Sequence, residues 1–224
     1  MPGATERPGI AAGRLRGLGT LPEGSGLSVM GRWLLACICC ALPLRATAGE
    51  RVRSLLELRE EHVVVQKWDT SCGASALATV LNFEYGDTVG EREVAAAMLR
   101  QAGVLKVKYR GGFSLLDLKR YANARGYEAD GYSGMSLGDL ADYLPLIVPV
   151  EVRGFPHFVV VRGFIGKRIA LADPAWGNRT MPTTEFDQAW KLKIGFVVTR
   201  PGQQAPPPDN RLVPRPSDRL LPSD

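Results

Sequence analysis

The chain has 224 residues, of which 45% are apolar and 8% aromatic, and this composition suffices for a globular core and excludes disorder throughout. Its net charge of +5 is uneven: residues 1–48 hold five arginines and two glutamates, whereas the remaining residues hold 23 basic and 21 acidic side chains. Because the larger part is nearly neutral and has no cluster of Lys or Arg, we predict no nucleic-acid partner.

Residues 1–48 are predicted to be an upstream extension followed by a signal peptide. The stretch MGRWLLACICCALPLRATAGE contains Arg32, the apolar run Leu34–Leu44 and then Ala46–Ala48, whose small side chains signal peptidase accepts. The apolar run is too short for a permanent transmembrane helix, so we expect no stable membrane span after cleavage. Met30 is the expected true start, cleavage is expected before Gly49, and the mature protein is expected to be periplasmic.

The cysteines follow from this prediction. Acylation of Cys37 is an alternative to cleavage after Ala48. It would leave almost no apolar run between Arg32 and the acylated cysteine. Cleavage after the whole signal removes Cys37, Cys39 and Cys40, so that Cys72 remains as the single thiol of the mature chain. In an oxidising compartment, where cysteines usually pair, a leftover thiol points to a reactive residue.

Residues 49–200 are predicted to form one domain of class α+β. Its first half has helically spaced apolar residues with glycine at the helix ends, and its second half has β-branched runs separated by Gly, Pro and Asn. The expected helices are 71–86, 91–103, 114–126 and 137–144, and the expected strands of an antiparallel sheet are 146–152, 157–164, 167–173 and 194–199. Residues 201–224, with seven of the 16 prolines, are predicted to be a disordered tail.

Cys72 follows Thr70 and Ser71, which are good N-cap residues, and is therefore expected in the first turn of a helix. Unsatisfied backbone donors and the helix dipole stabilise a thiolate there and make it nucleophilic. A thiolate nucleophile needs a proton acceptor, and the chain has two histidines. His62 opens an apolar run ten residues before Cys72 and is interpreted as a strand-end or surface residue, which leaves His157.

His157 is predicted to lie beside an acidic partner. Residues 157–173 indicate a β-hairpin, and if it is centred on Ile165, His157 faces Asp173 across the strand pair. An imidazole beside a carboxylate is typical of a general base held in orientation by its partner. A register slip of one residue would send one of the two to the opposite face, and a surface ion pair at a hairpin end is the alternative.

Gln66 is the fourth candidate. It lies six residues before Cys72 in a loop that returns to the helix start, where its amide N–H can point at the oxygen of an attacked carbonyl. One cysteine and two distant histidines give no metal-ligand spacing, and no G-x-x-x-x-G-K-[ST] motif occurs, so we expect neither a metal, nor another cofactor, nor ATP hydrolysis.

In combination, Gln66, the Ala/Leu-rich helix opened by Cys72, HFVVV with His157, and DPAWGN with Asp173 resemble peptidase family C39, the bacteriocin-processing cysteine peptidases of papain-like fold. The resemblance covers residues 63–199. It implies a papain-like domain in which Cys72 is the nucleophile, His157 the base, Asp173 the orienting carboxylate and Gln66 the oxyanion donor.

The resemblance also bears on the substrate. Members that mature bacteriocins are domains of ABC exporters and cut leader peptides after a double glycine, whereas GFSLLDLKRYA and DPAWGNR look more like stand-alone exported members, including the peptidase found beside functional-amyloid secretion systems. The expected activity is hydrolysis of a peptide bond in a secreted polypeptide, an amyloid or a leader peptide, through an acyl-enzyme. The alternative is a catalytically silent peptide-binding or secretion-accessory module, which would not need the four candidate residues intact.

Overall fold

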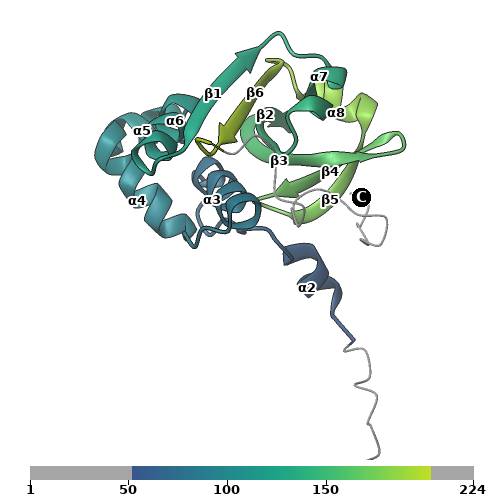
Figure 1. Cartoon of the computed structure of the whole chain (residues 1–224), viewed down its shortest axis with the longest axis horizontal. Coiled ribbons are helices and arrows are strands. Elements are labelled where there is room, and N and C mark those ends of the chain that lie inside the picture. The colour runs from purple at the N-terminus through teal and green to yellow at the C-terminus, as the bar shows by residue number, and fades with distance from the viewer. Residues whose placement is uncertain (1–51, 203–224) are drawn as a thin grey trace, which may run out of the picture. The chain divides into compact units, whose positions relative to one another are not determined.

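The computed structural model describes residues 52–202, in which helices pack against a six-stranded antiparallel sheet (Figure 1). The predicted extension, the signal peptide and nearly all of the Pro-rich tail lie outside the described residues. The elements in chain order are α2 (Leu55–Glu60), α3 (Cys72–Tyr85), α4 (Glu91–Ala102), α5 (Val104–Arg110), α6 (Leu115–Ala124), β1 (Glu128–Ser133), α7 (Leu137–Asp142), β2 (Leu146–Val152), β3 (Phe155–Ile165), β4 (Arg168–Asp173), β5 (Gly177–Pro182), α8 (Thr183–Ala189) and β6 (Ile194–Thr199). The predicted α+β class is confirmed.

The strand order is β1-β6-β2-β3-β4-β5, and the strands that sequence reasoning missed are the two at the edges. β1 exposes every residue except Ala129, and β5 begins with Gly177 and ends with Pro182. Neither has an apolar alternation: β1 is exposed at all but one residue, whereas the buried residues of β5 are Gly177, Asn178 and Thr180, and an edge strand tolerates Gly and Pro. Polar edge strands therefore escape a search for β-branched runs.

Helix α3 is the centre of the helical half, and it is buried on almost every side. Small residues allow this close packing: a Cβ on Gly73 would lie 3.2 Å from side-chain atoms of both Leu118 and Phe158. A helix that is apolar all round belongs in a core. Because Gly73 touches β3 through Phe158, the start of α3 is held against the strand that carries His157.

The sheet separates two hydrophobic clusters. Val160 of β3 lies in the cluster built with α3, α4 and α6, whereas the next residue, Val161, lies in the cluster that contains Phe186 of α8 and the fully buried Trp190. Successive residues of a strand point to opposite faces, so β3 is covered on both sides. In Figure 1, α7 and α8 lie on the side of the sheet away from α3.

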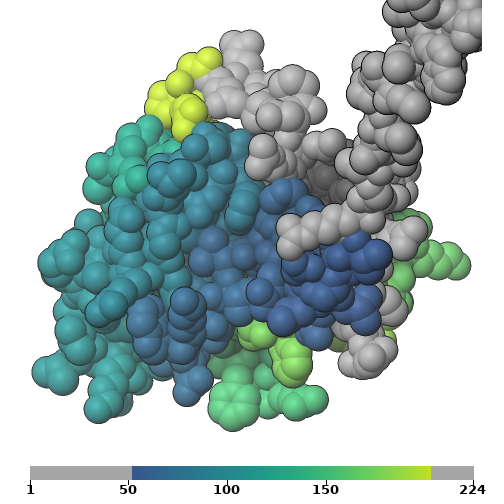
Figure 2. Space-filling view, turned by 90° about the horizontal axis from the view of Figure 1, so that it is seen from below, coloured from purple at the N-terminus to yellow at the C-terminus, as the bar shows by residue number. Residues whose placement is uncertain are grey.

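Helix α2 was not predicted, because its residues are all at least partly exposed, but it is bound firmly to the start of β5. The Arg59 guanidinium donates to the carbonyl of Trp176 at 2.9 and 3.2 Å, and the Asn178 amide donates to two carbonyls near the C-terminal end of α2 at 2.6 and 3.2 Å. Figure 2 shows the blue surface of the first described residues beside the green surface of later strands. Between these contacts lies Gly177, with φ +76°, where a Cβ would come within 2.3 Å of the Arg59 carbonyl oxygen.

We predict that Gly177→Ala destabilises the domain by more than the backbone cost of a positive φ, which is about 1–2 kcal/mol. The matched control is Gly166→Ala in the β3–β4 turn, which also has a positive φ but no atom within 4 Å of the added Cβ. The free energies of unfolding from urea titrations of both variants check the prediction. Equal losses would mean that α2 does not restrain this position.

Candidate active site

Cys72 is the first residue of α3, as predicted, and Ser71 is the N-cap. The Ser71 side chain does not cap the helix, because its hydroxyl is held between the carbonyl of Trp68 at 2.7 Å and the carboxylate of Glu91. The first backbone N–H groups of α3 are thus left without the usual side-chain acceptor. One of them, the N–H of Gly73, donates a hydrogen bond to the Cys72 thiol.

The structure brings Cys72, His157 and Asp173 together in one hydrogen-bonded chain. Nε2 of His157 donates to Oδ1 of Asp173 at 2.8 Å, and the imidazole is also hydrogen-bonded to the Cys72 thiol. Because Nε2 is occupied by the carboxylate, Nδ1 is the atom left for the sulfur. A thiol, an imidazole and an orienting carboxylate in this order are the arrangement that nucleophilic catalysis requires.

The hairpin register that predicted this proximity was wrong. β3 and β4 are joined by a tight turn that pairs Ile165 with Arg168, and the register shifts at a bulge between Val161 and Gly163. Val161 then pairs with Leu171, so strand alternation puts Asp173 on the same face as His157. On the turn side of the bulge, Gly163 pairs with Ala170. If this pairing continued without the one-residue bulge, the side chains of His157 and Asp173 would lie on opposite faces of the sheet.

The protonation of the site follows from burial and pairing. Burial raises the pKa of the Cys72 thiol, but the hydrogen bond and charge of His157, together with backbone N–H groups, outweigh it and leave this pKa below its usual range. Burial lowers the pKa of His157, but hydrogen bonds to Asp173 and Cys72 raise it to about 9. Burial also raises the pKa of Asp173, and the hydrogen bond to His157 and the charges of His157 and Arg179 hold it below its usual range. The favoured state is a thiolate beside an imidazolium.

Gln66 lies in the loop before α3, as predicted, and is fixed from two sides. Its backbone N–H donates to the carbonyl of Pro174 at 2.8 Å, directly after Asp173. Its side-chain Nε2 donates to the carbonyl of Trp68 at 3.0 Å, the same carbonyl that accepts from Ser71 beside Cys72. Its Oε1 is buried and has no hydrogen-bond partner among the described residues, so the amide retains unused polar capacity.

Sequence reasoning missed two charged residues that support this arrangement. Glu91, the first residue of α4, accepts from the backbone N–H of Lys67 at 2.8 Å and from the Ser71 hydroxyl, and so ties down the loop that carries Gln66. Arg179 donates from Nε to Oδ2 of Asp173 at 2.8 Å. A Glu at a helix start and an Arg in a polar strand are common at protein surfaces, so the sequence alone did not indicate that Glu91 and Arg179 belong to the site.

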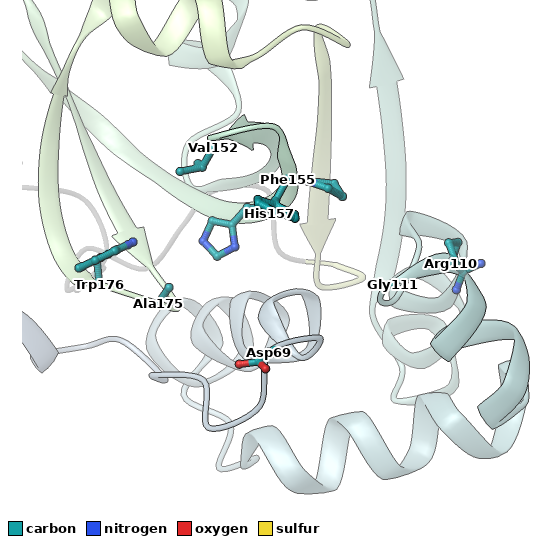
Figure 3. Close-up of a pocket in the computed structure, with 9 residues that line it drawn as sticks. Asp69, Arg110, Gly111, Val152, Phe155, His157, Ala175 and Trp176 are labelled. Carbon is teal, nitrogen blue, oxygen red and sulfur yellow. The ribbon is translucent and has the colours of Figure 1, made fainter.

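A hollow of about 450 Å³ opens beside His157 between the helical half and the sheet (Figure 3). In Figure 3 the imidazole lies above α3, with Trp176 to one side, Arg110 to the other, and Asp69 on the loop below. The apolar wall includes Phe155, 73% exposed, and Trp176, 54% exposed. Large exposed aromatics at the wall of a hollow are typical of a surface that binds a partner chain.

His62, the other histidine, is separate from this site: its ring packs against Phe83 with centroids 5.2 Å apart. Residues 52–202 contain no group of three or more His, Cys, Asp or Glu side chains arranged to hold a metal ion. Within the same residues, no helix is both long enough and apolar enough to cross a membrane.

Comparison with known proteins identifies the family. The model of the peptidase C39 family matches residues 60–201, which is more than half of the chain.

The chain belongs to peptidase family C39.

Two curated relatives are each named "Probable functional amyloid protease FapD". The one from Pseudomonas aeruginosa is 39% identical over 160 residues, which cover 70% of either chain. The one from Pseudomonas fluorescens is 37% identical over 170 residues, which cover 76% of this chain and 74% of the relative. The family membership predicted from the sequence is confirmed, and the protein is a cysteine peptidase.

Solved structures agree with this C39 assignment. A double glycine motif protease from an AMS/PCAT transporter, in complex with the leader peptide, is 31% identical with a TM-score of 0.52 and covers 62% of this chain and 90% of its own. The peptidase domain of Streptococcus ComA has the same TM-score at 21% identity, covers 62% of this chain and 97% of its own, and shows that the fold is shared.

We predict that His157→Ala raises the pKa of Cys72 above the usual value of about 8.5, because burial then acts without the imidazole. The measurement is the rate of iodoacetamide alkylation of Cys72 against pH, followed by mass spectrometry of the peptide that contains it. In the unmodified chain the midpoint should lie below 8.5, and His62→Ala, the matched control, should not move it. A midpoint that is the same with and without His157 would contradict the arrangement.

Proposed function

We propose that Cys72 is the nucleophile of a peptidase that hydrolyses a secreted polypeptide. The observation that carries the proposal is the hydrogen-bonded chain from Asp173 through His157 to Cys72 at the start of α3. The thiolate sulfur attacks the scissile carbonyl carbon, and the carbonyl oxygen takes up negative charge. The imidazolium then gives its proton to the leaving amine, and an acyl-enzyme remains on the sulfur.

Deacylation reverses the role of His157. Once the amine has left, the neutral imidazole takes a proton from water, the resulting hydroxide adds to the thioester carbonyl, and collapse of this intermediate returns the thiolate and the imidazolium. Asp173 stays ionised throughout and fixes the ring through Nε2, so that Nδ1 faces the sulfur. No step requires a metal or another cofactor.

In both steps the carbonyl oxygen needs donors. We assign the Gln66 side-chain amide and the backbone N–H at the start of α3 to this oxyanion site. The assignment rests on the N–H of Gln66 Nε2 that Trp68 does not use and on the uncapped helix start. Donors placed in advance cost no reorganisation during the reaction.

The substrate in this proposal is an extended polypeptide. The hollow beside His157 is lined by Val152, Phe155, Pro156 and Trp176, which suit apolar side chains next to the scissile bond better than two glycines. The FapD relatives support a secreted amyloid component as the client, and the protease solved with the leader peptide supports a leader as the other candidate. Both are polypeptides that a cleft of this kind can accept.

The decisive test is Cys72→Ala in a strain whose own copy of the gene is deleted. Removal of one partly exposed sulfur should leave the protein folded, while acyl-enzyme formation becomes impossible, so the client polypeptide should accumulate uncut. Size analysis of the secreted proteins gives the result. Normal client processing by this variant would instead support the binding module without turnover.

Gln66→Ala supplies a graded comparison when the purified variants cleave the isolated client polypeptide in vitro. Loss of one oxyanion donor should lower kcat by about 10²–10³ without loss of fold. Gln101→Ala, on the exposed face of α4, is the matched control and should retain full activity. An unchanged kcat in Gln66→Ala would remove that residue from the oxyanion site.

We further propose export through a signal peptide into the periplasm, with the mature chain starting at Gly49. The support is the basic, apolar and small-residue order of residues 32–48, together with relatives that are named functional amyloid proteases. N-terminal sequencing of the exported protein should give Gly49 or a neighbour. A mature chain that begins before Leu34 would contradict the signal peptide, and a lipid on Cys37 would convert the protein into an anchored enzyme.

A further inference from the structure

We infer that Arg179 is a positioning residue for the reaction, which acts through Asp173 to hold the thiolate and imidazolium in place. The inference rests on the proposed roles of Cys72, His157 and Asp173. Arg179 itself does not need to touch the substrate.

The geometry divides the two oxygens of Asp173 between two tasks. Oδ1 accepts from Nε2 of His157 at 2.8 Å and from the N–H of Ala175 at 2.9 Å, while Oδ2 accepts from Nε of Arg179 at 2.8 Å. The carboxylate cannot rotate without breaking a charge-assisted bond on one side or the other. Arg179 therefore fixes the oxygen that orients the imidazole.

Strand pairing places Arg179 where this contact is built in. In the β4–β5 pair, Asp173 lies opposite Gly177 and Leu171 lies opposite Arg179, so Arg179 is on the same face as Asp173 and one diagonal step away. The Asp173 side chain is 0% exposed and that of Arg179 is 13% exposed. An ion pair this deep is far less screened than a surface pair.

The charges of the site balance only when Arg179 is counted. A thiolate on Cys72, an imidazolium on His157 and a carboxylate on Asp173 sum to one negative charge in a largely buried place. The guanidinium of Arg179 brings this sum to zero. Without it, the buried Asp173 carboxylate would lose its second partner, and its protonated form would be favoured over the ionised form.

No other described cation takes this role. Arg59 of α2 donates to the carbonyl of Trp176, and Arg162 lies on the opposite face of β3, where it donates to Asn178. Among the acidic groups on the neighbouring elements, those that are exposed have no described hydrogen bond or ion pair to the site: Asp69 before α3, Asp139 and Asp142 on α7, Glu151 on β2, and Glu185 and Asp187 on α8. Two are buried: Glu84 lies at the end of α3 opposite to Cys72, and Glu91 accepts from Lys67 and Ser71. The environment of Asp173 is therefore governed by His157 and Arg179.

The consequence is a pH effect with a definite sign. If the positive charge is removed, the Asp173 carboxylate takes up a proton at higher pH than before and no longer accepts from His157. The imidazolium then loses its partner, and the thiolate of Cys72 forms only at higher pH. In a plot of Cys72 alkylation rate against pH, the midpoint of the rise should therefore move to higher pH. A purely structural loss would instead lower the rate at every pH and leave the midpoint unchanged.

The test is alkylation of Cys72 by iodoacetamide against pH on the full chain, read by mass spectrometry of the Cys72 peptide. Arg179→Met should raise the midpoint by about one pH unit, as expected for a lost opposite charge, which makes alkylation roughly tenfold slower below both midpoints. Arg179→Lys, which keeps the charge, should keep the midpoint close to that of the unmodified chain. Arg168→Met is the matched control, because Arg168 bridges the same two strands by bonding Thr180 and does not touch Asp173.

Further variants keep the outcome clear. If urea titration shows Arg179→Met to be unfolded, Arg179→Gln makes the same charge change with a polar side chain. In the Asp173→Asn background, Arg179→Met should cause no additional shift, because the residue acts through the carboxylate. A midpoint unchanged by loss of the charge, or a shift that persists without the carboxylate, overturns the inference. A midpoint near 8.5 in the unmodified chain overturns the proposed thiolate nucleophile instead.

Discussion

The 2.8 Å hydrogen bond between His157 and Asp173 is the contact on which the site depends. It fixes which imidazole nitrogen faces the sulfur, and it holds an ionised carboxylate at a position with no solvent exposure. Against the effect of burial, it and the hydrogen bond to Cys72 together raise the pKa of His157 to about 9. A buried carboxylate needs partners on every side. The polar contacts of the turn after β4 and of the start of β5 can be understood as the supply of those partners.

The helical half and the sheet each supply part of the site. The sheet supplies the imidazole and the carboxylate on one face of neighbouring strands, and a single bulge in β3 sets them on that face together. The helical half supplies the thiol at the start of a helix whose small residues allow it to approach β3 closely. Glu91 and the Trp68 carbonyl fix the loop before α3, so Cys72 and Gln66 are placed by one network.

Much of this could be predicted from the sequence, because the relevant signals are local. Helical spacing and glycine at helix ends located α3, α4 and α6, and β-branched runs located β2, β3, β4 and β6. Cys72 and His157 are rare residue types in this chain, and each lies at the predicted start of a helix or strand. The β3–β4 register could not be predicted, because turn length and bulge position depend on packing across the sheet. Arg179 and Glu91 could not be predicted either, because their partners are distant in the chain and become visible only once the strands and helices are paired.

The contact between α2 and Gly177 bears on where the catalytic unit begins. The family match starts at residue 60, the last residue of α2, so the shared boundary leaves out most of this helix. Arg59 and the carbonyls that bind Asn178 lie in or next to the omitted part, and they support the strand start between Asp173 and Arg179. A recombinant chain trimmed to the shared boundary would thus keep all four candidate residues yet lose the brace behind the carboxylate. The helix that braces this strand start thus lies mostly before the residues that the family model matches.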